Sequence, residues 1–385
     1  MHQNTKLSLT PNYITRKHKT MKKSYIKISF FTALAFFIVT KTDAQFASKK
    51  INPKYEAYND SLKNVKYNYV FPFWGQEAYK KGIDLQYPIG FMANYFWVTQ
   101  DVLIDNFQLG VDDIMNNYDM PLTPIPDSII SFGTNTNTTY SFNVRPDIWV
   151  YPFINVYGIF GYGHTSTDVE VFANLPGSEP LHFTAGINEG VATYGTGLLV
   201  AGGVGPVWFS LDGNFTWNKL KSLNKPTLGY VVGFRVGKMF VFKHKPESNI
   251  SIWAGSMFMY MQSETDGSSS FREVLGDDIW EKKDQLVQNY RHWYDYEATP
   301  AQKIIADKYI TPIIDGIDAR EGNSLVLYRM NKQVKSKFNG LLGIQYQMNK
   351  NWQFRSEGGF IGNRKSFIFS VNYRLLGFRK KAKIL

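Results

Sequence analysis

Long stretches in which apolar and polar residues alternate are the feature that most limits what this chain can fold into. The segment SFIFSVNYR (366–374) has an apolar residue, mostly aromatic, at every second position and polar residues at most of the others. Segments 85–97 and 207–218 repeat the pattern. A period of two is typical of a β-strand with one apolar and one polar face. These runs exceed the usual globular strand of about 5–6 residues.

Two environments produce such strands, namely a soluble sandwich and a membrane barrel. Aromatic residues make up 16% of the chain, as expected of aromatic girdles. Connections alternate between short and long, as in barrels with tight turns at one end. The polar faces also carry charges in mid-strand, which a solvated lumen tolerates: Arg145, Asp147, Asp212, Arg235, Arg355, Glu357 and Arg374. We therefore favour the barrel.

The fold class we predict is an all-β transmembrane antiparallel barrel, residues 85–376, with a helical extracellular insertion. We expect ten strands, at 85–111, 136–151, 153–174, 190–202, 206–219, 228–241, 250–260, 335–348, 351–361 and 366–376. Splitting the first and third of these gives twelve as the alternative count. The longer loops are expected at 112–135, 175–189, 220–227, 261–334 and 362–365. Segment 45–84 is expected in the periplasm, with a short helical part, and 377–385 is a basic tail.

A leader sets the expected compartment. From Met21 the chain reads MKKSYIKISFFTALAFFIVTKTDAQ, in which lysines precede an apolar run and small residues precede Gln45. This pattern indicates a signal peptide over 21–44, cleaved near Ala44. Residues 1–20 are interpreted as an upstream over-annotation; the alternative is a real tail before an uncleaved anchor. We expect the mature chain in the cell outer membrane.

The net charge of +11 is concentrated in the leader. Residues 1–44 hold eight Lys/Arg against one acid, which leaves 35 Lys/Arg against 31 Asp/Glu in the remainder. That near balance is not the basic patch of a nucleic-acid-binding protein. The chain has no Cys, which excludes disulfides and thiolate metal sites.

The signal segment, the aromatic strands and the closing strand SFIFSVNYRLLGF together resemble the outer-membrane β-barrel proteins of Gram-negative bacteria, including uncharacterised porin-like and surface barrels. Segment 145–162 resembles a hairpin of such barrels. The resemblance implies the outer-membrane bilayer and the barrel-assembly machinery as partners, but it implies no activity. The tail RKKAKIL (379–385) departs from the family, whose chains commonly end near the last strand.

The insertion at 261–334 interrupts the alternation. Ser270 with Glu273, and Thr299 with Gln302, form capping boxes, and apolar residues follow at helical spacing. We expect two amphipathic helices, either packed on themselves at the rim or acting as a lid or plug. We further expect an extracellular cap through which any extracellular ligand or protein partner is contacted. The candidate contact residues are Trp280, Tyr290, Trp293, Tyr294 and Tyr296.

The inward charges have three interpretations: an ion-paired plug, a constriction for small anions, or an active site. His164, Ser166 and Asp168 share one strand face but lie too far apart for a catalytic set, so we interpret them as a polar strand end. Acidic residues between 101 and 119 lack the spacing of a calcium loop. We assign no catalytic residue, metal or cofactor.

The alternation also predicts which side chains contact lipid and which point into the lumen. One set should contact lipid: Phe209, Leu211, Phe215, Phe367, Phe369 and Tyr373. Asp212, Arg355 and Arg374 should point inward. Arginine at Phe369 should be costly, whereas arginine at Ser370 should be milder if the lumen has room.

Three functions remain open. The first is a non-enzymatic barrel with a surface-binding or structural role. The alternatives are a small-solute channel, possibly anion-preferring, and a hydrolase at the barrel rim.

Overall fold

The computed structural model describes residues 53–113, 118–204, 206–221, 223, 225–261, 264–318 and 325–380. The expected signal peptide, the cleavage site and most of the basic tail lie outside these residues. The described strands are β1 Ile89–Asp113, β2 Tyr118–Pro124, β3 Ile130–Tyr151, β4 Ile154–Ala173, β5 Leu181–Val204, β6 Val207–Leu220, β7 Thr227–Phe242, β8 Lys245–Met261, β9 Glu264–Ser270, β10 Leu325–Val334, β11 Phe338–Gln347, β12 Trp352–Gly359 and β13 Arg364–Leu375.

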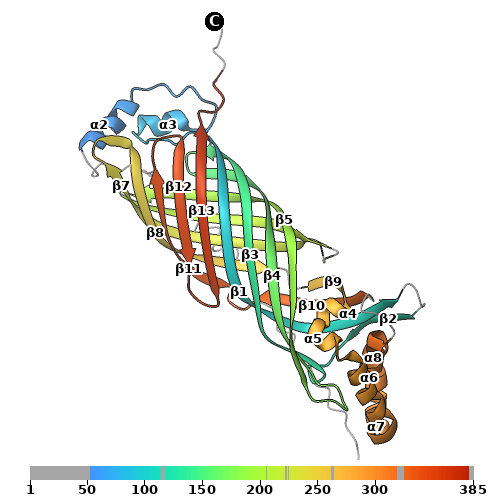
Figure 1. Cartoon of the computed structure of the whole chain (residues 1–385). Helices are drawn as coiled ribbons and strands as arrows, with labels where there is room; N and C mark the ends of the chain where they lie inside the picture. The colour runs from blue at the N-terminus through green and yellow to red at the C-terminus, as the bar shows by residue number, and fades with distance from the viewer. Residues whose placement is uncertain are drawn as a thin grey trace, which may run out of the picture. The chain divides into compact units, whose positions relative to one another are not determined.

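Ten of these strands close into an antiparallel barrel (Figure 1). Going round the wall, the order is β1, β3, β4, β5, β6, β7, β8, β11, β12 and β13. The barrel closes where β13 pairs with β1, from Ile89 opposite Leu375 to Gln100 opposite Arg364. Closure leaves this part of the sheet without an exposed edge. The prediction of ten strands is confirmed, and the alternative of twelve is wrong.

Side chains alternate across the barrel wall as the sequence predicts. On β13, Phe367, Phe369 and Tyr373 point outward and are exposed, whereas Ser370 and Arg374 point inward and are buried. An exterior covered with exposed Phe, Tyr, Leu and Val is far more apolar than the surface of a soluble protein. Ser370 is only 1% exposed, so the lumen has no free room at this position.

Two clusters of outward aromatic rings lie near the two ends of the barrel strands. Near the loop end, ring centroids are 4.3–6.1 Å apart among Tyr194, Phe215, Trp217, Tyr230 and Tyr260. Near the turn end, they are 4.7–6.4 Å apart among Phe242, Tyr346, Trp352, Phe354 and Tyr373. These positions match the two aromatic girdles of a membrane barrel.

The spacing of the two clusters fits a bilayer. Tyr230 and Phe242 both lie on β7, one in each cluster, and their positions differ by twelve residues. That separation is about 41 Å along a strand, or roughly 30 Å along the barrel axis at the usual tilt of about 40°. The architecture is therefore that of an outer-membrane β-barrel.

Several strands continue beyond the loop-end cluster. Above Gln100, β10 takes the place of β13 beside β1, with Val102 opposite Val334 and Asp112 opposite Leu325. Strand β9 pairs with β10, and β2 pairs with the end of β1. The paired β4 and β5 extend to Ala173 and Leu181. We call this outer part, made of β2, β9, β10 and the ends of β1, β3, β4 and β5, the sheet extension.

The sheet extension corrects three expected loops. Segment 175–189 is mostly strand, because β5 begins at Leu181, and 112–135 contains β2 and the start of β3. Segment 261–334 begins and ends with β9 and β10, so only its middle is helical. Strand β9 reads ETDGSSS and has no apolar residue to reveal it.

Five α-helices and one π-turn fill the described part of the insertion: α4 Phe271–Leu275, α5 Asp277–Trp280, α6 Lys283–His292, η1 Trp293–Glu297, α7 Pro300–Tyr309 and α8 Thr311–Asp318. Both predicted capping boxes are present, at Ser270 and Thr299. Tyr290 and Ile314 lie in a core that also includes Leu109, Leu175 and Val326 of the sheet extension and its loops. The helices therefore pack on the sheet extension as well as on each other.

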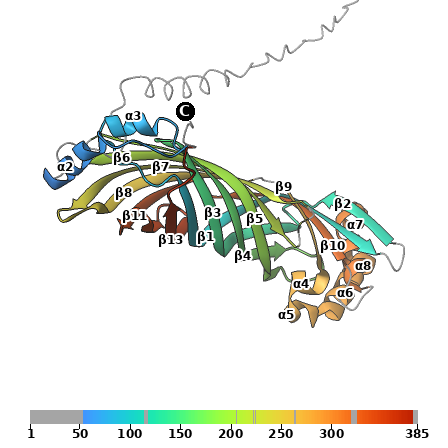
Figure 2. The ribbon, with the colours of Figure 1, turned by 90° about the horizontal axis from the view of Figure 1, so that it is seen from above.

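The segment before the first strand forms α2 Pro53–Leu62 and α3 Gly75–Lys80, which agrees with the expected helical part. It lies at the turn end of the barrel, opposite α4–α8 (Figures 1 and 2). Lys350, in the turn between β11 and β12, forms an ion pair of 2.8 Å with Asp84. The amide of Phe73 donates to the Val150 carbonyl. None of the described helices is long and apolar enough to cross a bilayer.

Candidate functional site

A cavity of about 540 Å³ runs inside the barrel. Its wall includes all seven charged residues predicted to face the lumen, namely Arg145, Asp147, Asp212, Arg235, Arg355, Glu357 and Arg374. Their strands bring them inward because each occupies the polar phase of its alternation. The cavity is therefore lined by both signs of charge.

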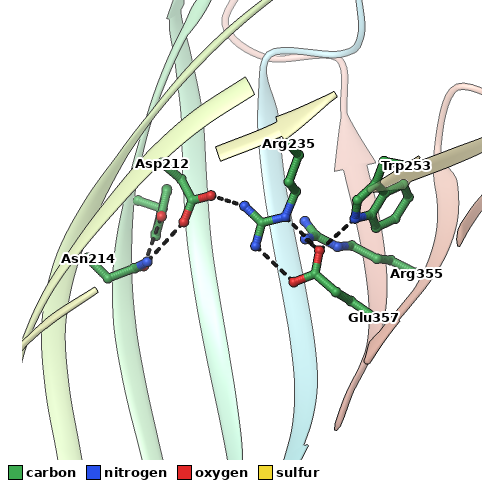
Figure 3. A network of polar contacts seen from close by, with 7 residues as sticks. Asp212, Asn214, Arg235, Trp253, Arg355 and Glu357 are labelled. Atoms are coloured by element: carbon green, nitrogen blue, oxygen red, sulfur yellow. Dashed lines mark hydrogen bonds and ion pairs between the residues drawn. The ribbon is translucent and has the colours of Figure 1, made fainter. Parts of the chain in front are cut away.

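The centre of the lumen is held by one guanidinium between two carboxylates (Figure 3). Arg235 of β7 donates from Nε and Nη2 to the two carboxylate oxygens of Glu357 on β12, at 2.6 and 2.8 Å. Its Nη1 donates to Asp212 of β6. Two-point pairs of this kind are among the strongest charge-assisted hydrogen bonds. Arg235 lies between Tyr230 and Phe242 on β7, so the group is near mid-membrane height.

Further contacts extend this group across the lumen. Trp253 of β8 donates to Glu357 at 2.7 Å, and Arg355 donates to the same carboxylate at 2.8 Å. On the other side, Asn214 donates to Asp212 and accepts from Tyr157 of β4. The guanidinium of Arg145, on β3, lies 5.5 Å from the Tyr157 ring centre. We call this chain of contacts from β3 to β12 the lumen network.

Close packing surrounds the lumen network. Gly233 lies on β7 beside it, and a Cβ atom there would come within 2.7 Å of both Arg235 Nη1 and Asp212 Oδ1. Side chains thus fill the space immediately around Arg235 and Asp212, where a wider barrel would hold water. Buried charges persist only when paired and hydrogen-bonded, and Arg235, Asp212 and Glu357 satisfy that condition.

A second ion pair lies at the turn end of the lumen. Arg374 donates to Asp147 at 2.9 Å and to the Tyr87 carbonyl at 2.7 Å. Asn155 donates to the same Asp147 oxygen at 2.6 Å. These contacts tie the last strand to β3, β4 and the chain entering β1. They anchor the N-terminal segment at the turn end.

Two lumen cations were missed by the sequence analysis. Arg364 begins β13 in the same inward phase as Arg374, but the predicted strand began two residues later. Lys332 lies on β10, inside the segment expected to be helical. Both line the cavity. Extending the alternation of β13 by one period would have found Arg364.

The residues considered for catalysis lie elsewhere. On β4 the cavity is lined by Thr165 and Thr167, so the alternate residues His164, Ser166 and Asp168 belong to the outward face. Among the described residues, no group of three or more His, Asp or Glu side chains is arranged to hold a metal ion.

The aromatic residues proposed as a contact surface mostly build the insertion itself. Tyr290 is 1% exposed, and Trp280, Trp293 and Tyr294 pack against the same core. Only Tyr296 is largely exposed, at 79%. Tyr290 is therefore a core residue, Trp280, Trp293 and Tyr294 are only partly buried, and Tyr296 is open to solvent.

Comparisons with known proteins give limited similarity. No protein-family profile and no curated protein matches the chain. Among solved structures, the translocator domain of autotransporter NalP from Neisseria meningitidis is 11% identical, with a TM-score of 0.30 over 84% of this chain and 94% of that one. The beta domain of the Bordetella autotransporter Brka is 12% identical, with a TM-score of 0.28 over 75% and 100%. Similarity this low carries no argument about function, and the fold assignment rests on the barrel itself.

Proposed function

We propose that this protein is an outer-membrane barrel with a closed lumen, whose role is to hold the sheet extension and its helices outside the cell. The observation that carries the proposal is the lumen network, which joins β3 to β12 near mid-membrane height. A barrel whose interior is bridged by paired charges is suited to structural support and surface contact rather than to solute passage. The proposed role is non-enzymatic.

The surface of the helices supports contact with a partner outside the cell. Ile304 of α7 is 71% exposed, and Ile305 and Tyr296 are also exposed. Exposed apolar side chains grouped at one site are typical of interaction surfaces.

A small-anion channel is the second candidate. It is favoured by Arg145, which forms no ion pair among the described residues and whose buried Nε has no hydrogen-bond partner there. An unpaired guanidinium would favour anions over cations in any residual pathway. Ion-selectivity measurements on the reconstituted barrel distinguish this function from a closed lumen.

Surface labelling tests the proposed arrangement. Because the chain has no Cys, single variants give unambiguous sites. On intact cells, a membrane-impermeant maleimide should label Tyr296→Cys but not His244→Cys, which lies in a turn at the opposite end. Labelling of His244→Cys alone would show that the barrel has the opposite orientation. Labelling of neither variant would show that the protein is not exposed at the cell surface.

A further inference from the structure

Arg364 is the most deeply buried cation of the lumen wall. It is 1% exposed and lines the cavity. Its Nε donates to Gln100 Oε1 at 2.8 Å. Its Nη1 and Nη2 atoms are buried and have no hydrogen-bond partner among the described residues. A guanidinium normally has its donors satisfied, because leaving them unpaired costs free energy.

Neighbouring polar side chains lie between this guanidinium and a second cation. Gln100 on β1 is the register partner of Asn137 on β3, and Asn137 donates to Thr167 of β4 at 2.9 Å. The Lys332 ammonium lies 3.3 Å from the same Thr167 hydroxyl. All five side chains line the cavity. Two cations and their polar neighbours therefore follow one another round the lumen wall.

The carboxylates near these cations do not neutralise both. Glu189 of β5 lines the same cavity and attracts Lys332. No ion pair joins Arg364 to a carboxylate of the described residues, in contrast to Arg235, which contacts two. Of the two cations, Arg364 and Lys332, Arg364 is thus the one whose charge would be neutralised more by a bound anion.

An apolar wall completes the cavity beyond the lumen network. Four methionines line it, together with Tyr328: Met257, Met259 and Met261 of β8, and Met330 of β10. Methionine side chains adapt to ligands of different shape. The loop side is one part of a cavity of about 540 Å³ that also reaches the turn end, and small-molecule sites combine apolar walls of this kind with a few fixed polar groups.

From this arrangement we infer that the lumen on the loop side of the network binds a small amphipathic anion. Its carboxylate or phosphate group accepts from Nη1 and Nη2 of Arg364, and its apolar body packs on the methionines. Lys332 adds a second positive charge. The guanidinium fork suits either oxyanion, because both present two oxygens at matching spacing. The inference does not depend on whether the lumen conducts ions.

Calorimetric titration of the full barrel in nanodiscs tests the site. Benzoate and phenyl phosphate supply an oxyanion on an apolar ring, benzamide supplies the ring without charge, and inorganic phosphate supplies the charge alone. We expect one site per barrel for benzoate, phenyl phosphate or both, with benzamide and inorganic phosphate binding at least about tenfold more weakly because each lacks half of the recognition. The stronger of the two aromatic probes identifies the oxyanion.

Variants connect binding to the named residues. Arg364→Gln should weaken the aromatic anion about tenfold or more, since it removes a charged two-point contact. Lys365→Gln is the matched control, because it removes one positive charge from the next residue of the same strand, on the outward face; binding should stay within about twofold. If Arg364→Gln does not fold, Arg364→Lys keeps the charge without the fork and should still weaken binding several-fold.

Three results would overturn the inference. The first is no binding of either aromatic anion to the wild-type barrel. The second is benzamide binding as tightly as benzoate. The third is a folded Arg364 variant with unchanged affinity for the anions.

Discussion

Arg235 and Glu357 are 122 residues apart in the chain, yet two hydrogen bonds of 2.6 and 2.8 Å join them inside the barrel. Strands β8 and β11 lie between their strands in the barrel wall, so the pair spans part of the lumen rather than linking neighbours. Asp212 and Arg355 extend the pair on its two sides. This pairing explains why charged residues occur in the middle of strands whose opposite face contacts lipid.

Removing the shared carboxylate should be strongly destabilising. Glu357→Gln leaves Arg235 and Arg355 without their common counter-charge in a buried site, where loss of one partner costs about 3–5 kcal/mol. Urea unfolding in lipid vesicles measures the change in free energy of unfolding. The control is Glu281→Gln, an exposed carboxylate of the insertion, which should change stability by less than about 0.5 kcal/mol. Equal effects of the two variants would show that the lumen network contributes no stability.

The lipid-facing phase can be tested on β13. Phe369→Arg places a charge on the exposed aromatic face and should cost about 2–4 kcal/mol if that residue is near the bilayer midplane. Phe369→Leu is the matched control and should cost much less, since the side chain stays apolar. Ser370→Arg should also be severe rather than mild, because Ser370 is buried in the packed lumen. Tolerance of Phe369→Arg in the vesicle unfolding assay would place that face away from lipid.

Much of the barrel could be predicted because the environment of each side chain, lipid or lumen, determines whether that residue is apolar or polar. A strand between lipid and a polar lumen must alternate, so β6, β7 and β13 were found within about two residues at each end. Strand β9 could not be found, since it pairs above the membrane and needs no apolar face. Strand β10 carries only a weak alternation around Arg329 and Lys332.

The sequence predicted that the charged side chains of the candidate site point into the lumen, but it did not predict which of them pair with one another. Alternation alone turned Arg235, Asp212 and Glu357 inward. Alternation does not predict that Arg235 forms ion pairs with both Asp212 and Glu357 while Arg145 lies over the Tyr157 ring, because those contacts depend on strand order and register. The candidate contact residues of the insertion include the buried Tyr290 as well as the exposed Tyr296, since helical spacing does not separate a core ring from an exposed one.

Deleting the helices tests whether the barrel needs them. A variant that replaces 271–318 with a short Gly-Ser linker retains β9 and β10, which continue the wall beside β1. We expect it to migrate as a folded, heat-modifiable barrel on gels. Leu109, Leu175 and Val326 lose their cover in this variant, so hydrogen exchange should increase in the sheet extension and remain slow in β6 and β7. A barrel that does not fold would show that the insertion is required for assembly.

High pH should release the N-terminal segment. Burial raises the pKa of Tyr55 in α2 to about 12, so the folded segment holds this proton more tightly than the unfolded one. The contribution of protonated Tyr55 to the stability of the folded segment is complete below the ordinary tyrosine pKa of about 10. It is lost as the pH rises through about 12. The pKa of Lys350 is also raised, since its pairing with Asp84 outweighs the opposing effect of burial, and its contribution is lost in the same direction.

A fluorophore on Asn64→Cys reports this release as a fall in anisotropy between about pH 10 and 12. In a Tyr55→Phe background the fall should begin at higher pH, because no phenol has to be deprotonated. Release at neutral pH, or a transition that Tyr55→Phe leaves unchanged, would exclude Tyr55 as the controlling group.

Planar-bilayer recording of the refolded wild-type barrel tests the closed lumen most directly. With insertion verified by heat-modifiable migration and by recording a known porin in the same bilayers, we predict no unitary conductance steps, as a closed lumen requires. Steps should appear when the lumen network is removed by Arg235→Ala combined with Glu357→Ala, because the contacts from β3 to β12 are then broken. Reproducible steps from the wild-type protein, of the same size as those of the double variant, would contradict a closed lumen.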